Sequence, residues 1–100
     1  MEPIMSKPFK VSIEDHSDGA FTLRTDRKPE SFEEKILFVA SMGVALRVHK
    51  GEKDREAIGR EVLDIAVREA EDAARDEYDH ETLVAMCRRA VDAALDEAEL

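Results

Sequence analysis

The first pattern along the chain is a short alternation of apolar and polar side chains on both sides of residues 15–19. A period of two is typical of a half-buried β-strand. Residues 15–19 read Asp-His-Ser-Asp-Gly, and an Asp-Gly pair is a strong signal for a tight chain reversal. We therefore predict a β-hairpin over residues 9–24. Because an isolated hairpin is only marginally stable, another element must pack against its apolar face. Its apolar face consists of Phe9, Val11, Ile13, Phe21 and Leu23.

A helix is predicted over residues 31–50. Ser31 and Glu34 have the spacing of a capping box, in which both side chains accept hydrogen bonds from free amides at the helix start. Gly51 suits the left-handed backbone that commonly follows a last helical turn. Residues 36–46 are apolar on nearly all faces, so this helix is either central to the fold or shared with another subunit.

Sharing this helix between subunits predicts a homodimer. A two-stranded hairpin and two further helices offer little surface with which to enclose a helix that is apolar all round. Two copies would enclose it by pairing their hairpins edge to edge or by crossing these helices, and twofold dimers are the commonest oligomers. The candidate dimer-interface residues are Ile36, Phe38, Val39, Met42 and Leu46.

Apolar residues at helical spacing predict two more helices, over residues 54–77 and 80–99. Asp54 and Asp79 suit the N-cap positions, and the short turn between the helices predicts an antiparallel helical hairpin. The apolar stripe predicted for the first of them is Ile58, Val62, Ile65, Ala66, Ala70, Ala73 and Ala74. The stripe predicted for the second is Leu83, Val84, Cys87, Ala90, Val91, Ala94, Leu95 and Ala98.

Together these elements predict an α+β fold, with an N-terminal β-hairpin followed by three α-helices. The length of 100 residues and the composition, 43% hydrophobic and 39% charged, predict a single globular domain over residues 1–100. Residues 1–8 contain two prolines and little periodicity, so we expect a loose leader there. The longest apolar stretch, residues 36–46, is too short to cross a membrane.

Charge divides the chain into two unlike halves. Residues 1–50 carry eight acidic and eight basic side chains, whereas residues 51–100 carry sixteen acidic and seven basic ones. The whole formal charge of −9 therefore lies on the predicted helical hairpin. Such a surface favours a basic protein partner and disfavours direct binding of nucleic acid or of an anionic membrane.

Two acidic clusters have few basic neighbours in the sequence. Many other acids lie four residues from an arginine, as in Asp64–Arg68 and Glu71–Arg75, so a solvated helix face explains them. Acids after Arg89 instead place negative charge at a helix C-terminus, where the helix dipole disfavours it. We predict that these clusters bind a partner. The candidate residues are Asp76, Glu77, Asp79 and Glu81 at the turn, and Asp92, Asp96, Glu97 and Glu99 near the end.

Basic residues gather around Gly51, beside a predicted helix start, which is a setting that phosphate favours. Glu52 and Asp54 are interleaved with them and no glycine-rich loop is present, so a solvated loop is the simpler interpretation. The possible anion contacts are Arg47, His49, Lys50, Lys53 and Arg55.

Other chemistry has little support in the sequence. Cys87 lies on the predicted apolar stripe, so we expect a small core residue rather than a nucleophile. No histidine or cysteine pair has metal-ligand spacing, although the acidic turn at residues 15–18 leaves cation binding open. We expect no cofactor and no resident metal. A single cysteine excludes an internal disulfide and is typical of a reducing compartment, so we expect a cytoplasmic protein.

The sequence therefore predicts a small acidic protein-binding or regulatory module that is not an enzyme. One alternative is an inhibitor that mimics nucleic acid and blocks the basic channel of a nuclease, as anti-restriction and anti-CRISPR proteins do. A second alternative is a small-ligand binder that uses a pocket at a dimer seam. The position and pairing of the acidic side chains distinguish these hypotheses.

Overall fold

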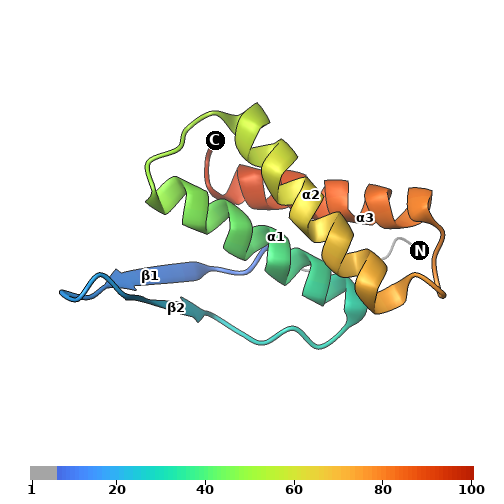
Figure 1. Ribbon diagram of the computed structural model, residues 1–100, viewed down its shortest axis with the longest axis horizontal. Coiled ribbons are helices and arrows are strands. Elements are labelled where there is room, and N and C mark those ends of the chain that lie inside the picture. The colour runs from blue at the N-terminus through green and yellow to red at the C-terminus, as the bar shows by residue number, and fades with distance from the viewer. Residues whose placement is uncertain (1–6) are drawn as a thin grey trace.

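The chain folds into a β-hairpin followed by three helices, as the computed structural model shows for residues 7–100 (Figure 1). Strands β1 (Val11–Asp15) and β2 (Phe21–Thr25) are antiparallel. Helices α1 (Phe32–His49), α2 (Arg55–Ala74) and α3 (His80–Glu97) follow in order. The predicted α+β fold class is therefore confirmed. Of the predicted leader, residues 1–6 lie outside the part of the chain that the structure describes.

The hairpin has the predicted turn and an apolar face that is only partly covered. Gly19 takes a φ of 89°, a left-handed conformation that glycine adopts without strain. Ile13 lies opposite Leu23, and both side chains are half-buried. Phe21 is on the same face but remains 49% exposed. The reason is that β1 packs against α1, whereas no Cα atom of β2 lies within 8 Å of a Cα atom of a helix in the described chain.

Helix α1 begins and ends where its capping residues predict. The Ser31 hydroxyl accepts a hydrogen bond from the amide of Glu34 at 3.1 Å. The Glu34 carboxylate accepts one from the amide of Glu30 at 2.9 Å, one residue before the N-cap. Gly51 has a φ of 94°, and its amide bonds the carbonyl of Val48 at 2.9 Å. These bonds satisfy backbone groups that a helix end otherwise leaves without partners.

Helix α1 is the centre of the fold. It lies against α2, α3 and β1, so different elements cover different sides of it (Figure 1). Phe38 meets Phe9 edge-to-face with ring centroids 5.3 Å apart, and the guanidinium of Arg27 lies 3.9 Å from the Phe9 ring centre. The apolar circumference of α1 is thus largely explained within one chain. The predicted dimer through Ile36, Phe38, Val39, Met42 and Leu46 stays a prediction: Ile36 is buried and the other four are half-buried.

The helical hairpin packs through narrower stripes than the sequence predicts. Buried positions on α2 recur every four residues, and those of α3 include Leu83, Cys87 and Leu95. Ile65 was expected on the α2 stripe but is 38% exposed, and Ala73 is exposed as well. The buried residues of α2 form a single row at every fourth position, and the flanking Ile65 and Ala73 face solvent. Within residues 7–100, no helix combines the length and the apolar character that crossing a membrane requires.

Candidate functional site

The predicted partner-binding acids form two separate groups on the helical hairpin. We call Asp76, Glu77, Asp79 and Glu81 the turn cluster, because they lie in the α2–α3 connection and the first turn of α3. We call Asp92, Asp96, Glu97 and Glu99 the C-terminal cluster, at the other end of α3. All eight residues are exposed. Helix α3 has 18 residues. At about 1.5 Å of rise per residue, its length keeps most of the two clusters well apart.

The turn cluster is almost free of internal compensation. In the described chain, the carboxylates of Asp76, Glu77 and Glu81 have no hydrogen bond or ion pair. Arg75 is the nearest base in sequence, but its guanidinium lies 3.8 Å from the carboxylate of Asp72. This contact joins the C-cap residue of α2 to the last turn of the same helix. Three carboxylates at this end of the molecule therefore face solvent without a counter-charge.

Asp79 differs from its neighbours because it caps α3. Its carboxylate accepts a hydrogen bond from the amide of Thr82 at 2.8 Å. Hydrogen bonds from the Thr82 side chain and amide lower the pKa of Asp79 below its ordinary value of 3.8. A lowered pKa in the folded state means that the ionised form stabilises the fold. Asp79 thus has a structural role that does not depend on any partner.

Replacing Asp79 with alanine is expected to lower the melting temperature at neutral pH, because a free amide of α3 loses its acceptor. Asparagine caps about as well as aspartate, so Asp79→Asn is the matched control and is expected to melt close to the parent protein. The stabilisation by the carboxylate is complete above pH 3.8 and is lost as the pH falls through the lowered pKa. Thermal melts across this range should show the parent protein and Asp79→Ala converging at low pH. Equal melting temperatures at pH 7 would contradict the capping role.

The C-terminal cluster is partly neutralised by a residue that is distant in sequence. Arg55, the first residue of α2, donates to Asp96 Oδ1 at 2.9 Å and to the carbonyl oxygen of Leu100 at 2.7 Å. This arginine supplies the cation that the last turn of α3 lacks, and it offsets the unfavourable helix dipole there. Asp92, Glu97 and Glu99 have no ion pair within the described residues. Local spacing could not predict the pair, because its members are 41 positions apart.

Local ion pairs are fewer than the spacing predicts. Asp64 and Arg68 form the expected pair at 3.1 Å. Glu71 and Arg75 do not pair with each other. The Glu71 carboxylate instead lies 2.5 Å from Nδ1 of His80, so it links α2 to the start of α3. Contacts between elements therefore replace some of the local pairs that the sequence predicts.

The basic residues around Gly51 do not converge on one anion site. Arg47 donates to Glu61 Oε2 at 2.6 Å and to the carbonyl of Gly43 at 3.2 Å. His49 Nε2 lies 3.0 Å from Asp15 Oδ1, and Arg55 is engaged at the C-terminal cluster. Lys50 and Lys53 are exposed and have no ion pair in the described chain. Three of the five possible anion contacts are thus already bound within the protein.

The cysteine and the acids of the hairpin turn, which were the other candidates for chemistry, are held by contacts within the protein. Cys87 is fully buried, and its burial raises the pKa of the thiol to about 11, which makes thiolate chemistry unfavourable. The acids of the hairpin turn point to different partners, since Asp15 meets His49 and Asp18 accepts from the amide of Ala20. Over residues 7–100, no three histidine, cysteine or acidic side chains are grouped to hold a metal ion.

Comparison with known proteins adds no family or relative. No protein-family model, no curated protein and no solved structure matches the chain. The functional argument therefore depends on the geometry and charge of the surface itself.

Proposed function

We propose that this protein is a non-enzymatic protein-binding module whose turn cluster binds a basic surface of a partner protein. The observation that supports the proposal most directly is the state of Asp76, Glu77 and Glu81, which are exposed and unpaired in the described chain. Uncompensated charge steers the encounter with an oppositely charged partner and makes association dependent on ionic strength. A reducing compartment such as the cytoplasm suits this module, because its cysteine is a buried thiol.

The turn cluster is the better contact of the two acidic groups. Its exposed carboxylates lie in the short connection between two packed helices and in the first turn of α3, so the packed helices hold the charges in place. In the C-terminal cluster, Asp96 already pairs with Arg55. Removing that pair would also disturb the last turn of α3. We therefore assign partner recognition first to the turn cluster.

The arrangement of charge on α3 supports protein binding over mimicry of nucleic acid. Arg88 and Arg89 are both exposed and lie between the two acidic clusters. They interrupt the row of negative charge that a mimic of a phosphate backbone would present. A basic patch on a folded protein needs only one compact acidic group, which the turn cluster provides. Competition between nucleic acid and this protein for the partner would therefore distinguish a nucleic-acid mimic from a protein-binding module.

The test is affinity capture from a lysate of the source organism with three baits that are analysed by quantitative mass spectrometry. The first bait is the unmodified protein. The second is the variant Asp76→Asn/Glu77→Gln/Glu81→Gln, which spares the capping residue Asp79. The third is the control Asp18→Asn/Glu52→Gln/Glu56→Gln, which has the same net charge as the second bait but alters acids of the hairpin turn, the α1–α2 connection and the start of α2, at the opposite end of the molecule (Figure 1). Only the second bait removes the proposed contact.

A basic partner is expected to bind the unmodified and control baits at low salt and to be released at high salt. Three exposed ion pairs of about 0.5 kcal/mol each correspond to roughly a tenfold loss of affinity for the second bait. Equal recovery of the partner on both variants, or capture that salt does not weaken, would contradict the proposal. Release of the partner by added duplex DNA would favour the nucleic-acid mimic instead.

A further inference from the structure

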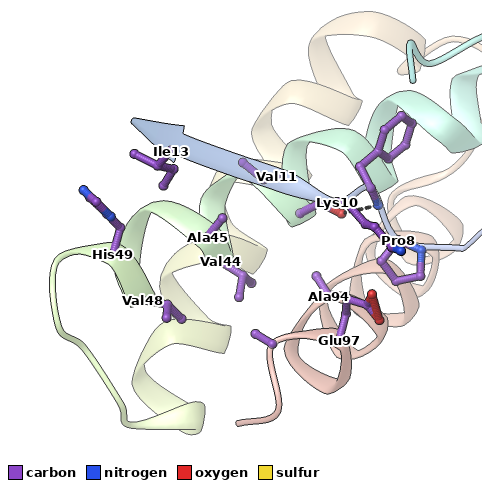
Figure 2. A pocket seen from close by; sticks show the side chains of 13 residues that line it. Pro8, Lys10, Val11, Ile13, Val44, Ala45, Val48, His49, Ala94 and Glu97 are labelled. Atoms are coloured by element: carbon purple, nitrogen blue, oxygen red, sulfur yellow. Dashed lines mark hydrogen bonds between the residues drawn. The ribbon is translucent and has the colours of Figure 1, made fainter. Parts of the chain in front are cut away.

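An open apolar groove of about 430 Å³ lies where β1, α1 and the end of α3 meet (Figure 2). Helix α1 lines it through Val44, Ala45 and Val48, and α3 contributes Ala94 and Ala98. Clefts that bind small molecules have volumes of about 300–1,000 Å³, apolar walls and a few polar groups that orient the ligand. This groove has the size and the walls of such a cleft, so its polar groups decide which ligand it suits.

Two polar side chains of the groove already have partners within the protein. The hydroxyl of Ser41 accepts a hydrogen bond from the amide of Phe9 at 3.1 Å, a contact that holds the start of the hairpin against α1. At the other end of the groove, His49 Nε2 lies 3.0 Å from Asp15 Oδ1 (Figure 2). These contacts fix the shape of the groove and leave its remaining polar groups to meet a ligand.

Lys10 and Glu97 are charged side chains of the groove that lack a partner. Both are exposed, and neither has an ion pair within residues 7–100. Lys10 directly precedes β1 and Glu97 is the last residue of α3. Figure 2 places both at the end of the groove near Pro8, away from His49. One end of the groove therefore offers a positive and a negative charge beside apolar walls.

These two charges restrict the chemistry of the ligand. An apolar anion such as a fatty acid would be attracted by Lys10 and repelled by Glu97, and an apolar amine would be attracted and repelled by the opposite residues. A neutral apolar molecule would gain nothing from either charge. A molecule that carries an ammonium group, a carboxylate and an apolar side chain would pair with both residues and would also cover the apolar walls.

We propose that this groove binds a free amino acid with a large apolar side chain. The ammonium group of the ligand donates to Glu97 and its carboxylate accepts from Lys10. Its side chain lies against Val44, Ala45 and Val48. Phenylalanine is the best probe, because an aromatic ring covers a large apolar area. All these contacts are made within one chain, so the site needs no dimer seam.

The amino-acid site is separate from the surface that we propose for a basic protein partner. Glu97 belongs to the C-terminal cluster, whereas the turn cluster lies at the other end of α3, which has 18 residues. At about 1.5 Å of rise per residue, the length of this helix keeps the two sites well apart. The inference therefore does not rest on the proposed function, and substitutions can remove either activity alone.

Titration of the ¹⁵N-labelled protein with L-phenylalanine, followed by two-dimensional NMR, tests the proposal. At about pH 6.5 the α-amino group is protonated and the carboxylate is ionised. Saturable shifts are expected for backbone amides of β1, of residues 44–48 and of the last turn of α3. Glycine, which has no apolar side chain, is expected to cause no saturable shift. L-phenylalaninamide and N-acetyl-L-phenylalanine each lack one charge and should bind about fivefold more weakly, the effect of one exposed ion pair.

Two substitutions should change this selectivity in opposite ways. Lys10→Gln is expected to bind L-phenylalanine no better than L-phenylalaninamide, because the contact to the carboxylate is gone. Glu97→Gln is expected to bind L-phenylalanine no better than N-acetyl-L-phenylalanine, because the contact to the ammonium group is gone. Lys53→Gln and Glu81→Gln are the matched controls. Each removes an exposed charge of the same kind outside the groove and is expected to bind all three compounds like the parent protein.

Filling the groove tests its walls without altering either charge. Ala45 is half-buried, and Ala45→Phe is expected to abolish the saturable shifts. Equal binding of the three phenylalanine compounds by the parent protein would overturn the proposal. Shifts that map outside the groove, no saturable shift at all, or unchanged selectivity in Lys10→Gln and Glu97→Gln would overturn it as well.

Discussion

Replacing Ile58 with alanine is expected to lower the free energy of unfolding by about 2–5 kcal/mol. Ile58 lies in the first turns of α2, is 0% exposed and is one of the largest fully buried side chains. Truncation removes apolar contacts in the shared core of the helices and leaves a cavity that its rigid neighbours fill only in part. A domain of this size has a total stability on the order of 5–15 kcal/mol, so this one change uses a large part of it.

Ile65→Ala is the matched control for this prediction, because it makes the same truncation on the same helix. Ile65 is 38% exposed, so folding removes less of its side chain from water than it removes of Ile58. Its truncation is expected to cost less than about 1 kcal/mol. Urea denaturation followed by circular dichroism measures both losses, with similar m-values for the two variants. Similar losses of stability would mean that the core is not centred on Ile58.

The contrast between these two isoleucines shows where sequence periodicity stops being informative. Both residues fit an apolar helical stripe, and the sequence placed both on it. Periodicity identifies the face of a helix that is apolar, but the width of the contact depends on how closely the neighbouring helices approach. On α2 the contact is one residue wide, since its buried positions recur at every fourth residue. Element types and ends were predicted more closely, because capping residues and turns act locally.

The candidate site shows the same division between local and distant effects. Exposure of the turn cluster follows from its position in the connection between α2 and α3 and in the first turn of α3, which the sequence locates by the end of one apolar stripe and the N-cap of the next helix. The pair of Arg55 with Asp96 and that of His49 with Asp15 join residues 41 and 34 positions apart. No local pattern indicates which basic side chain crosses between elements. The balance of free and neutralised charge therefore required the fold.

Gly43 is a buried residue of α1. A glycine inside a helix costs stability, so its presence there indicates a close approach by another element. In the structure, a Cβ atom at Gly43 would lie 3.0 Å from Val62 Cγ1 and 3.2 Å from Val62 Cγ2. The missing side chain is what allows α1 and α2 to approach so closely.

Gly43→Ala is expected to lower the free energy of unfolding by about 1–2 kcal/mol. Overpacking costs roughly 1–3 kcal/mol, and the better helix propensity of alanine offsets about 0.5–1 kcal/mol of it. Gly59→Ala is the matched control, because its added methyl would lie 3.4 Å from Leu95 Cδ1, an ordinary contact with the end of a side chain. This control is expected to gain about 0.5–1 kcal/mol, so the two substitutions have opposite signs.

A double-mutant cycle with Val62→Ala identifies the cause of the Gly43 effect. Val62 is 0% exposed, so its methyl groups have little room to move away from a new neighbour. Val62→Ala removes those methyl groups, and Gly43→Ala should then cost nothing further or even stabilise the helix. The coupling energy is expected to be about 1–3 kcal/mol, which exceeds the additivity error for distant sites. An equal cost of Gly43→Ala in both backgrounds would place its origin in α1 itself rather than in the contact between the two helices.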